Sequence, residues 1–215
     1  MAGSAAAGGP RFTREAAEVR RRALVDAALA ALAERGSAIS VRDVARRAGV
    51  SPGLIRHHFG SFGALLAEAY RQAVSRVDDI LDGAAQAAGE DPERRFLAFL
   101  AASFSPAIVD PDLLWAWLGL WGVVRRDPDA ATAHAQTFAA YRARLERLLG
   151  DLARARARAL DVRPSAIALS AMLDGLWLEL CLDPASFTPQ ESVEMVRAWV
   201  DARVAAAPPR GPDRP

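Results

Sequence analysis

The chain has 215 residues, of which 52% are hydrophobic and 25% are charged, and its formal net charge is +1. The hydrophobic share excludes a disordered chain, and the single cysteine, Cys181, excludes an intramolecular disulfide and argues against a cysteine-based zinc site. Residues 1–10 lack the apolar core of a signal peptide, and the most apolar run, 113–124, is far shorter than the ~20 residues that span a bilayer. We therefore expect a soluble cytoplasmic protein that uses no cofactor and no metal and does not enter a membrane.

Charge is unevenly distributed along the chain. Residues 1–76 hold twelve arginines and six acidic residues, a net charge of +6, whereas residues 77–215 have a net charge of −5. A basic N-terminal third on an acidic remainder indicates that this end meets a polyanion, although ordinary scatter of surface charge is the alternative explanation.

Helix signals follow one another along the whole chain, and the composition is rich in Ala and Leu. The first predicted helices cover 17–35, ended by Gly36; 41–48, capped by Ser40; 52–59, with proline at its first position; and 61 to about 81. After a Gly/Asp-rich gap at 83–91, Asp-Pro pairs predict helix starts at residues 92, 111 and 128. The next helix is predicted over 164–182, and a capping box at Thr188–Glu191 begins the last, to about 204. The prediction is an all-α fold of nine helices, with disordered tails at 1–12 and 205–215.

The segment 40–59 has the pattern of a helix-turn-helix. Two short helices are joined at Gly49, which can adopt the positive φ of a sharp turn, and at Val50, which can fill the space between them. Their shared core is predicted to contain Val44, Ala45, Ala48, Ile55 and Phe59. The second helix of such a motif enters the major groove, where Arg56 can reach a guanine edge. A tight helical hairpin with solvated charges is the alternative.

The sequence Ile39–Phe59, ISVRDVARRAGVSPGLIRHHF, resembles the headpiece of TetR-family regulators. The resemblance implies a TetR-like fold with a three-helix DNA-binding headpiece at 13–62 and a ligand-binding and dimerisation domain at 63–204. It also implies bacterial origin and a homodimer that binds a palindromic double-stranded operator and is released by a small molecule. The implied DNA-binding residues are Ser40, Arg42, Ser51, Pro52, Gly53, Leu54, Arg56, His57 and His58.

Three positions depart from the usual pattern of that family. His58 stands where many members have tyrosine, and Gly60 and Phe62 replace frequent lysines that grip phosphate. These differences weaken contacts to the DNA backbone, so affinity is expected to be modest unless the arginine cluster at 14–22 compensates.

All five tryptophans lie in the C-terminal two-thirds of the chain. Segments 113–126, 132–149 and 172–178 resemble the sensing domain of BetI-like TetR regulators, which implies a small organic cation as a possible effector. The predicted ligand-binding residues are Phe104, Trp117, Trp121, Tyr141, Asp174 and Trp177, because aromatic rings and a carboxylate can enclose an amine. Aromatic residues that only fill the core are the alternative, and an apolar effector is the alternative ligand. Asp174 could equally be a buried carboxylate paired with an arginine or a helix N-terminus.

The last two predicted helices carry apolar residues on more than one face and are expected to need a partner. In the family they form a four-helix bundle with their twofold mates. The predicted dimer interface is Leu169, Leu173, Leu176, Val193, Val196 and Val200; burial inside a monomer is the alternative. Cys181 is expected to be a packing residue.

An enzyme and a helical adaptor protein are the two alternative classes of function. The three histidines match no metal-ligand motif, and the chain has no nucleophile elbow, P-loop or Rossmann fingerprint, so an enzyme is not expected. A helical adaptor would explain the core but not the basic headpiece. The sequence does not reveal the effector, the operator, the regulated genes, or whether the protein represses or activates transcription.

Overall fold

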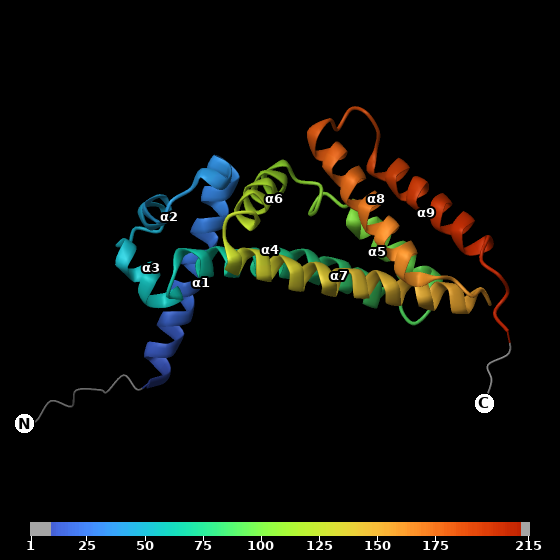
Figure 1. Ribbon diagram of the computed structural model, residues 1–215, viewed down its shortest axis with the longest axis horizontal. Coiled ribbons are helices and arrows are strands. Elements are labelled where there is room, and N and C mark those ends of the chain that lie inside the picture. Colours follow the sequence, from blue (N-terminus) through green and yellow to red (C-terminus); the bar gives the residue numbers. More distant parts are fainter. Residues whose placement is uncertain (1–9, 212–215) are drawn as a thin grey trace, which may run out of the picture. The chain divides into compact units, whose positions relative to one another are not determined.

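The computed structural model describes residues 10–211, with side chains from residue 17 onward (Figure 1). Within that range it contains nine α-helices, one 3-10 turn and no strand. The helices are α1 (Pro10–Arg35), α2 (Val41–Arg47), α3 (Pro52–Phe59), α4 (Phe62–Ala87), α5 (Pro92–Ser103), α6 (Pro111–Val124), α7 (Pro128–Ala155), α8 (Val162–Leu182) and α9 (Pro189–Ala205), with the turn η1 (Gly36–Ala38) after α1. The all-α prediction and the number of helices are therefore confirmed.

Local chemistry explains most of the helix boundaries. The Asp91 carboxylate accepts hydrogen bonds from the amides of Glu93 and Arg94, and Thr188 forms a capping box with Glu191, as the Asp-Pro and Thr-Pro signals predict. Three helix boundaries differ from the prediction by two or more residues: the start of α1, the end of α4, and the start of α8, which is Val162 instead of residue 164. Helix α1 begins at Pro10, a residue whose fixed φ suits a first helical turn. The predicted tails at 1–9 and 212–215 lie outside the described residues.

Helix α4 continues through the predicted gap at Gly83 and ends at Ala87. A glycine inside a helix costs only about 1 kcal/mol relative to alanine. Leu81 and Ala85, on either side of it, are buried in the core, so packing holds the helix together there.

The described chain divides into two compact units. One consists of the residues up to Gln72 together with Ala116–Ala133, and the other consists of Ala73–Trp115 and the residues from His134 onward. The predicted boundary at residue 62 therefore does not coincide with the boundary between the units, because a segment distant in sequence completes the first one.

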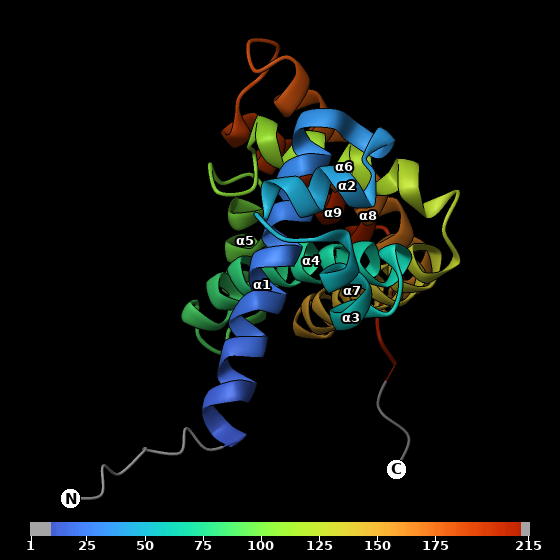
Figure 2. The same ribbon diagram turned by 90° about the vertical axis from the view of Figure 1, so that its left-hand side faces the viewer.

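The first unit is built around α1. Helix α2 lies against α1, and α3 lies against α2, in both views of the ribbon (Figures 1 and 2). Leu24, Leu32 and Leu65 are fully buried there, together with Tyr70 from α4. One small core thus holds the predicted headpiece and the first turns of α4.

The second unit packs α5, α8 and α9 around a core that includes Phe99, Leu169 and Val196. Arg156, after α7, joins two other helices: it binds both carboxylate oxygens of Glu93 on α5, at 2.5 and 2.7 Å, and Asp201 on α9 at 2.7 Å. These carboxylates raise the pKa of Arg156 above its already high value, so its charge is permanent. Arg144 on α7 is similarly bound to Asp78 and Asp82 of α4.

The chain after α9 differs from the predicted tail as far as residue 211. The amide of Ala159 donates to the carbonyl of Pro208 at 2.8 Å, and the amide of Arg210 donates to the carbonyl of Ala157 at 2.9 Å. Arg158 and Pro209 form an antiparallel bridge, and the Arg158 side chain donates to the carbonyl of Ala207. Backbone pairing therefore holds residues 207–210, where proline and alanine composition alone suggested a free end.

Candidate functional site

The turn between α2 and α3 has the geometry of a helix-turn-helix. Gly49 has a φ of +65°, as predicted from its place in the turn. The amide of Val50 donates to the carbonyl of Ala45, and the amide of Gly49 donates to the carbonyl of Arg46, which together form a Schellman motif. A residue with a side chain at position 49 would be strained in this left-handed conformation.

The two helices share the predicted core. Val44 and Ala45 on α2 and Ile55 on α3 are buried, and Val50 and Phe59 are half-buried. The close approach of α2 and α3 therefore depends on small and β-branched side chains, and their polar residues are left for the outside.

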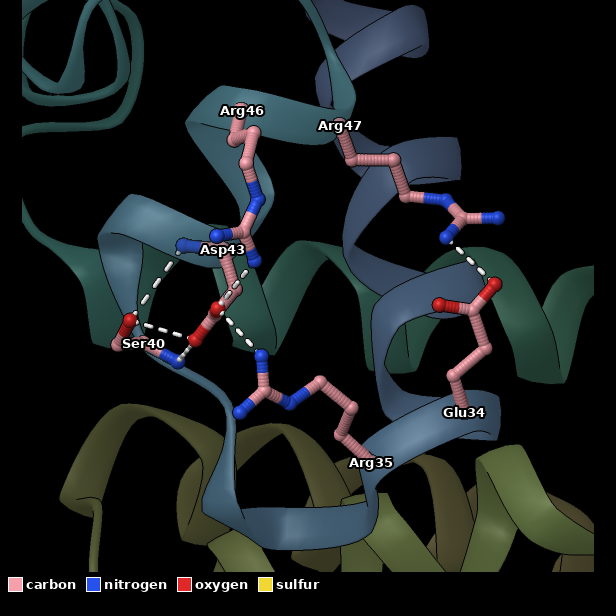
Figure 3. Close-up of polar contacts among 6 residues, drawn as sticks. All are labelled: Glu34, Arg35, Ser40, Asp43, Arg46 and Arg47. Carbon is pink, nitrogen blue, oxygen red and sulfur yellow. Dashed lines mark hydrogen bonds and ion pairs between the residues drawn. The ribbon is translucent and has the colours of Figure 1, made fainter.

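A network of charged side chains fixes the start of α2 to the end of α1 (Figure 3). The Asp43 carboxylate accepts hydrogen bonds from the backbone amide and the hydroxyl of Ser40, at 2.9 and 2.6 Å, and from Arg35 and Arg46 at 2.7 and 2.8 Å. The hydrogen bonds with Ser40, followed by the two arginines, lower the pKa of Asp43. Arg47 binds Glu34 of α1 at 2.6 Å. The Ser40 side chain, predicted to approach phosphate, is thus engaged in capping α2.

Most of the predicted DNA-binding residues share the solvent-exposed side of α2 and α3. Arg42, Ser51, Pro52, Gly53, Arg56 and His57 are exposed, whereas Leu54 and His58 are half-buried. Ser51 is the N-cap of α3 but its side chain makes no capping hydrogen bond, so the hydroxyl is not committed to the helix. This side presents two guanidinium groups and the start of a helix, a combination suited to bases and phosphates.

Arg21 of α1 braces the end of α3, a contact that the sequence pattern did not reveal. Its guanidinium donates to the carbonyl of His58 at 2.9 Å, lies 4.3 Å from the centre of the Phe59 ring, and is 3.9 Å from the Glu68 carboxylate of α4. The predicted phosphate-binding cluster at 14–22 therefore has one member turned toward the protein. The Arg14 side chain lies outside the described residues, and Arg20 and Arg22 are exposed.

The environment of His58 disfavours the charged form of its imidazole. Burial, followed by the charges of His57, Arg20 and Arg21, lowers its pKa below the usual value. A neutral imidazole donates a weaker hydrogen bond to phosphate than an imidazolium does.

The second half of α6 packs directly on the end of α1. A side-chain carbon at Gly122 would lie 2.6 Å from Cβ of Ser37, and one at Gly119 would lie 3.1 Å from the carbonyl oxygen of Leu32. These glycines permit a backbone approach that larger residues would prevent. The sequence pattern does not predict this contact, because glycines such as Gly119 and Gly122 within an apolar helix do not by themselves indicate what packs against them.

The predicted ligand-binding residues fall into the two units. In the first, Trp117 packs edge-on against the buried Tyr70, with ring centres 5.3 Å apart, and Trp121 lies 6.2 Å from Trp117. Among the described residues, no acceptor meets the buried indole N–H of Trp121. A buried donor without a partner costs about 1–3 kcal/mol.

In the second unit, Phe104 is buried in the core and the indole N–H of Trp177 donates to the carbonyl of Ile108 at 2.8 Å. The polar end of Trp177 is therefore used within the fold. Cys181 is half-buried, and burial raises the pKa of its thiol, which fits a packing residue rather than a reactive one.

Asp174 and Tyr141, both in the second unit, have pKa values that burial raises. Burial raises the pKa of Asp174 to about 6, and a hydrogen bond with Ser170, one turn earlier, opposes the shift only in part. Burial and the nearby Asp174 charge in turn raise the pKa of the Tyr141 phenol beyond its usual range. Asp174 is thus a carboxylate at a mostly desolvated position, which a bound cation would stabilise.

The structure shows which faces of α8 and α9 remain outside. Of the predicted dimer residues, Leu169, Leu173, Val196 and Val200 are buried in the core of their own chain, and only Leu176 and Val193 are partly accessible. The outer face of α8 is instead formed by the exposed Ile167, Ala168, Ala171 and Leu182 and the half-buried Gly175 and Leu178, and Ala198 and Ala202 are exposed on α9. We call these eight residues the outer apolar face.

By length and composition alone, α8 is long and apolar enough to cross a membrane. Its mean hydropathy is 1.5, and about a third of its most apolar stretch is buried inside the chain. Its inner side belongs to the core that contains Leu169 and Leu173. Ile167 on the outer side is 49% exposed. The apolar character of α8 therefore serves two faces, one packed inside the chain and one uncovered.

The sequence matches two family profiles. Residues 24–69 match the bacterial regulatory proteins of the tetR family, and residues 92–205 match the C-terminal domain of BetI-type transcriptional repressors. A relative from Rhizobium meliloti (strain 1021), the HTH-type transcriptional regulator BetI, is 33% identical over 189 residues, which cover 87% of this chain and 91% of the relative.

Solved structures give the same result. A protein from Pseudomonas aeruginosa PAO1, described as a transcriptional regulator, is 43% identical with a TM-score of 0.84, and the match covers 92% of this chain and 96% of that one. A Saccharomonospora viridis protein solved in complex with choline shares the fold at 19% identity, with a TM-score of 0.71 and coverage of 86% and 96%.

Proposed function

The chain belongs to the TetR family of bacterial regulatory proteins and has a BetI-type C-terminal domain; from this premise we propose that it represses transcription as a homodimer on a palindromic operator and is released by a small organic cation. It is a transcriptional regulator and not an enzyme. Because its proposed operator lies on the bacterial chromosome, we propose that it acts in the cytoplasm.

The observation that carries the DNA-binding proposal is the exposure of Arg42 and Arg56 on a helix pair whose other charged groups are tied down. Asp43 holds Arg35 and Arg46, and Arg21 holds the end of α3. The two remaining guanidinium groups are presented on a rigid support, which favours direct readout of bases.

We expect Arg56→Ala and Arg42→Ala each to weaken operator binding by about 1–3 kcal/mol and to relax preference at particular bases. The operator can be found by selecting bound fragments from a random duplex library and from the promoters next to the gene. Binding is then measured by fluorescence anisotropy at several salt concentrations. Arg147→Ala, at an exposed position of α7, is the matched control and should bind as wild type does. A variant with unchanged affinity and base preference would show that its arginine does not read bases.

A second copy of the chain is the proposed partner of the outer apolar face. A stripe of alanine, glycine and aliphatic residues lets two helices approach closely, and twofold symmetry places the same stripe on both sides of the interface. Family membership supports the same arrangement of α8 and α9. The interface residues proposed from exposure thus replace the four that are buried in the core.

The cation proposal rests on Asp174 and on Tyr141, an aromatic residue close enough for the charge of Asp174 to affect its pKa. Asp174 and Tyr141 belong to the same unit, and the S. viridis protein of the same fold binds choline. Phe104 and Trp177, in the same unit as Asp174, are the proposed wall residues, whereas Trp117 and Trp121 lie in the other unit and remain a separate prediction. An apolar effector is the second candidate, favoured by the burial of Phe104 and by the use of the Trp177 N–H within the core.

We expect choline to bind more weakly as the pH falls through 6, because protonation of Asp174 removes its charge, with the apparent affinity falling tenfold per pH unit below that value. A raised pKa means that the folded state holds the proton more tightly than the unfolded state. Asp174 therefore favours folding below pH 4, and this contribution is lost as the pH rises through 6. Asp174→Asn should accordingly stabilise the free protein by about 2 kcal/mol at pH 7.5 and weaken choline binding at least tenfold.

Tryptophan fluorescence titrations at pH 5–8 measure the binding, with 3,3-dimethylbutan-1-ol as the uncharged analogue of choline and with betaine aldehyde and polyamines as further cations. Thermal unfolding measures the stability. If the uncharged analogue binds as tightly as choline and releases the operator, the cation proposal is wrong and the apolar effector is favoured.

A further inference from the structure

A pocket lies in the second unit, among residues that none of the proposed functions uses. It is a depression of about 460 Å³, open to solvent and bordered by the end of α7, the loop that follows, the start of α8 and the segment after α9. This size falls within the range of small-molecule sites in proteins. Its walls come from four parts of the chain, and the segment after α9 contributes Arg210.

The construction of the loop fixes the shape of this pocket. Ala157, two residues after the end of α7, has a left-handed φ of 53°, and the amide of Arg158 donates to the carbonyl of Ala153. A left-handed alanine is less stable than glycine in this conformation. The hydrogen bonds between residues 157–159 and 208–210 hold it there.

The lining of the pocket carries more positive than negative charge. Arg154, Arg158 and Arg210 line it, whereas Asp161 is the one acidic residue among its lining residues. Arg156, at the neighbouring position, is neutralised by Glu93 and Asp201, but Arg158 donates to a carbonyl oxygen, which leaves its positive charge in place. Arg154 is paired with Asp151 on its own helix.

The start of α8 adds to the positive field. Asp161 is its N-cap but makes no side-chain hydrogen bond to the first turn, and Val162, the first helical residue, lines the pocket. The N-terminus of a helix this long carries a partial positive charge and amides that can bind an anion. The arginines and the helix start therefore attract the same kind of ligand.

The rest of the wall is apolar. Leu160, Val162 and Ala153 contribute hydrocarbon surface beside the arginines. We propose that this pocket binds a small organic anion, a carboxylate or a phosphate monoester with a compact apolar body. Arg154, Arg158 and Arg210 bind the acidic group, and the apolar side chains contact the body. Because the ligand touches both the loop and the segment after α9, it fastens the C-terminal segment to the unit.

The test uses the full-length protein in the absence of DNA. Phenyl phosphate and benzoate are titrated by isothermal calorimetry, with phenol as the neutral control, inorganic phosphate as the control without an apolar body, and sodium chloride to equalise ionic strength. We expect one of the two aromatic anions to bind tightly enough to measure and to raise the unfolding temperature, while phenol does neither. Which of them binds distinguishes a phosphate site from a carboxylate site.

Two arginine variants complete the test. Arg210→Gln and Arg154→Gln should each weaken binding of that anion about tenfold or more, because a charged hydrogen bond is lost. The backbone bonds of residue 210 remain in the first variant, and residue 154 is exposed, so both should fold. Arg147→Gln, on α7 but outside the pocket, should bind as wild type does. The proposal is overturned if neither aromatic anion binds beyond the salt-matched blank, if inorganic phosphate binds equally well, or if the double variant retains wild-type affinity.

Discussion

Ala171→Arg on the outer apolar face of α8 is expected to produce a folded monomer that no longer binds the operator. Ala171 is exposed within the chain, so arginine there finds water and leaves the core intact. In the proposed dimer the same position is buried against its symmetry mate. Each dimer would then contain two desolvated charges, each costing several kcal/mol without a partner. We expect dimer affinity to fall by about a thousandfold or more.

Sedimentation velocity and operator binding measure this effect, and circular dichroism checks the fold. Ala101→Arg, at an exposed alanine of α5, is the matched control and should remain a dimer. Ile167→Arg should repeat the result. A wild-type protein that sediments as a monomer at micromolar concentration, or an Ala171→Arg variant that stays a dimer, would refute the interface. Val196→Arg is unsuitable for this test, because Val196 is fully buried in its own chain and its replacement would unfold the protein.

Gly122→Ala is expected to have the second largest effect. Its new methyl group would lie 2.6 Å from Cβ of Ser37, well inside van der Waals contact, so α6 and the end of α1 must separate. Overpacking of this kind costs about 1–3 kcal/mol in stability, more than the gain in helix propensity from replacing glycine. Operator affinity should fall with it, because α1 carries the Arg21 contact to α3.

A second glycine provides the control for Gly122→Ala, and a substitution of Ser37 provides the rescue. Gly83→Ala on α4 places its methyl group in open space and should stabilise the protein by about 1 kcal/mol. Ser37→Gly removes the atom that Gly122→Ala would strike, so the double variant should regain most of the lost stability and operator affinity. Chemical unfolding and anisotropy titrations measure the two quantities. Failure of the rescue would mean that the effect arises elsewhere on α6.

Elements with local chemical causes could be predicted from the sequence. The helix starts at Asp91 and Thr188, the turn at Gly49 and the pairing of α2 with α3 each depend on residues within a few positions of one another. Non-local contacts could not be predicted in this way. Arg21 and His58 are 37 positions apart, and the docking of residues 207–210 depends on partners about 50 positions earlier.

The faces of α8 show a different limit. Both sides of this helix are apolar, so hydrophobic periodicity could not decide which side enters the core. The larger leucines at 169 and 173 pointed to an interface, but they are the residues that fill the chain's own interior. The small residues Ala168 and Ala171 are exposed and Gly175 is half-buried. Small residues of this kind do not by themselves predict an interface.

The packing of α6 on the end of α1 has a practical consequence for anyone who wishes to build a hybrid regulator from this protein. The motif at 39–59 suggests dividing the chain just after the start of α4. The transferred N-terminal fragment would then contain Leu32 and Ser37 but not Gly119 and Gly122, which pack against them. The donor fragment would then expose apolar surface, and the host's own sixth helix would collide with it unless glycines stood at the same two places. A working exchange must carry residues 116–133 together with the headpiece, so the transferable part of this protein is discontinuous in its gene.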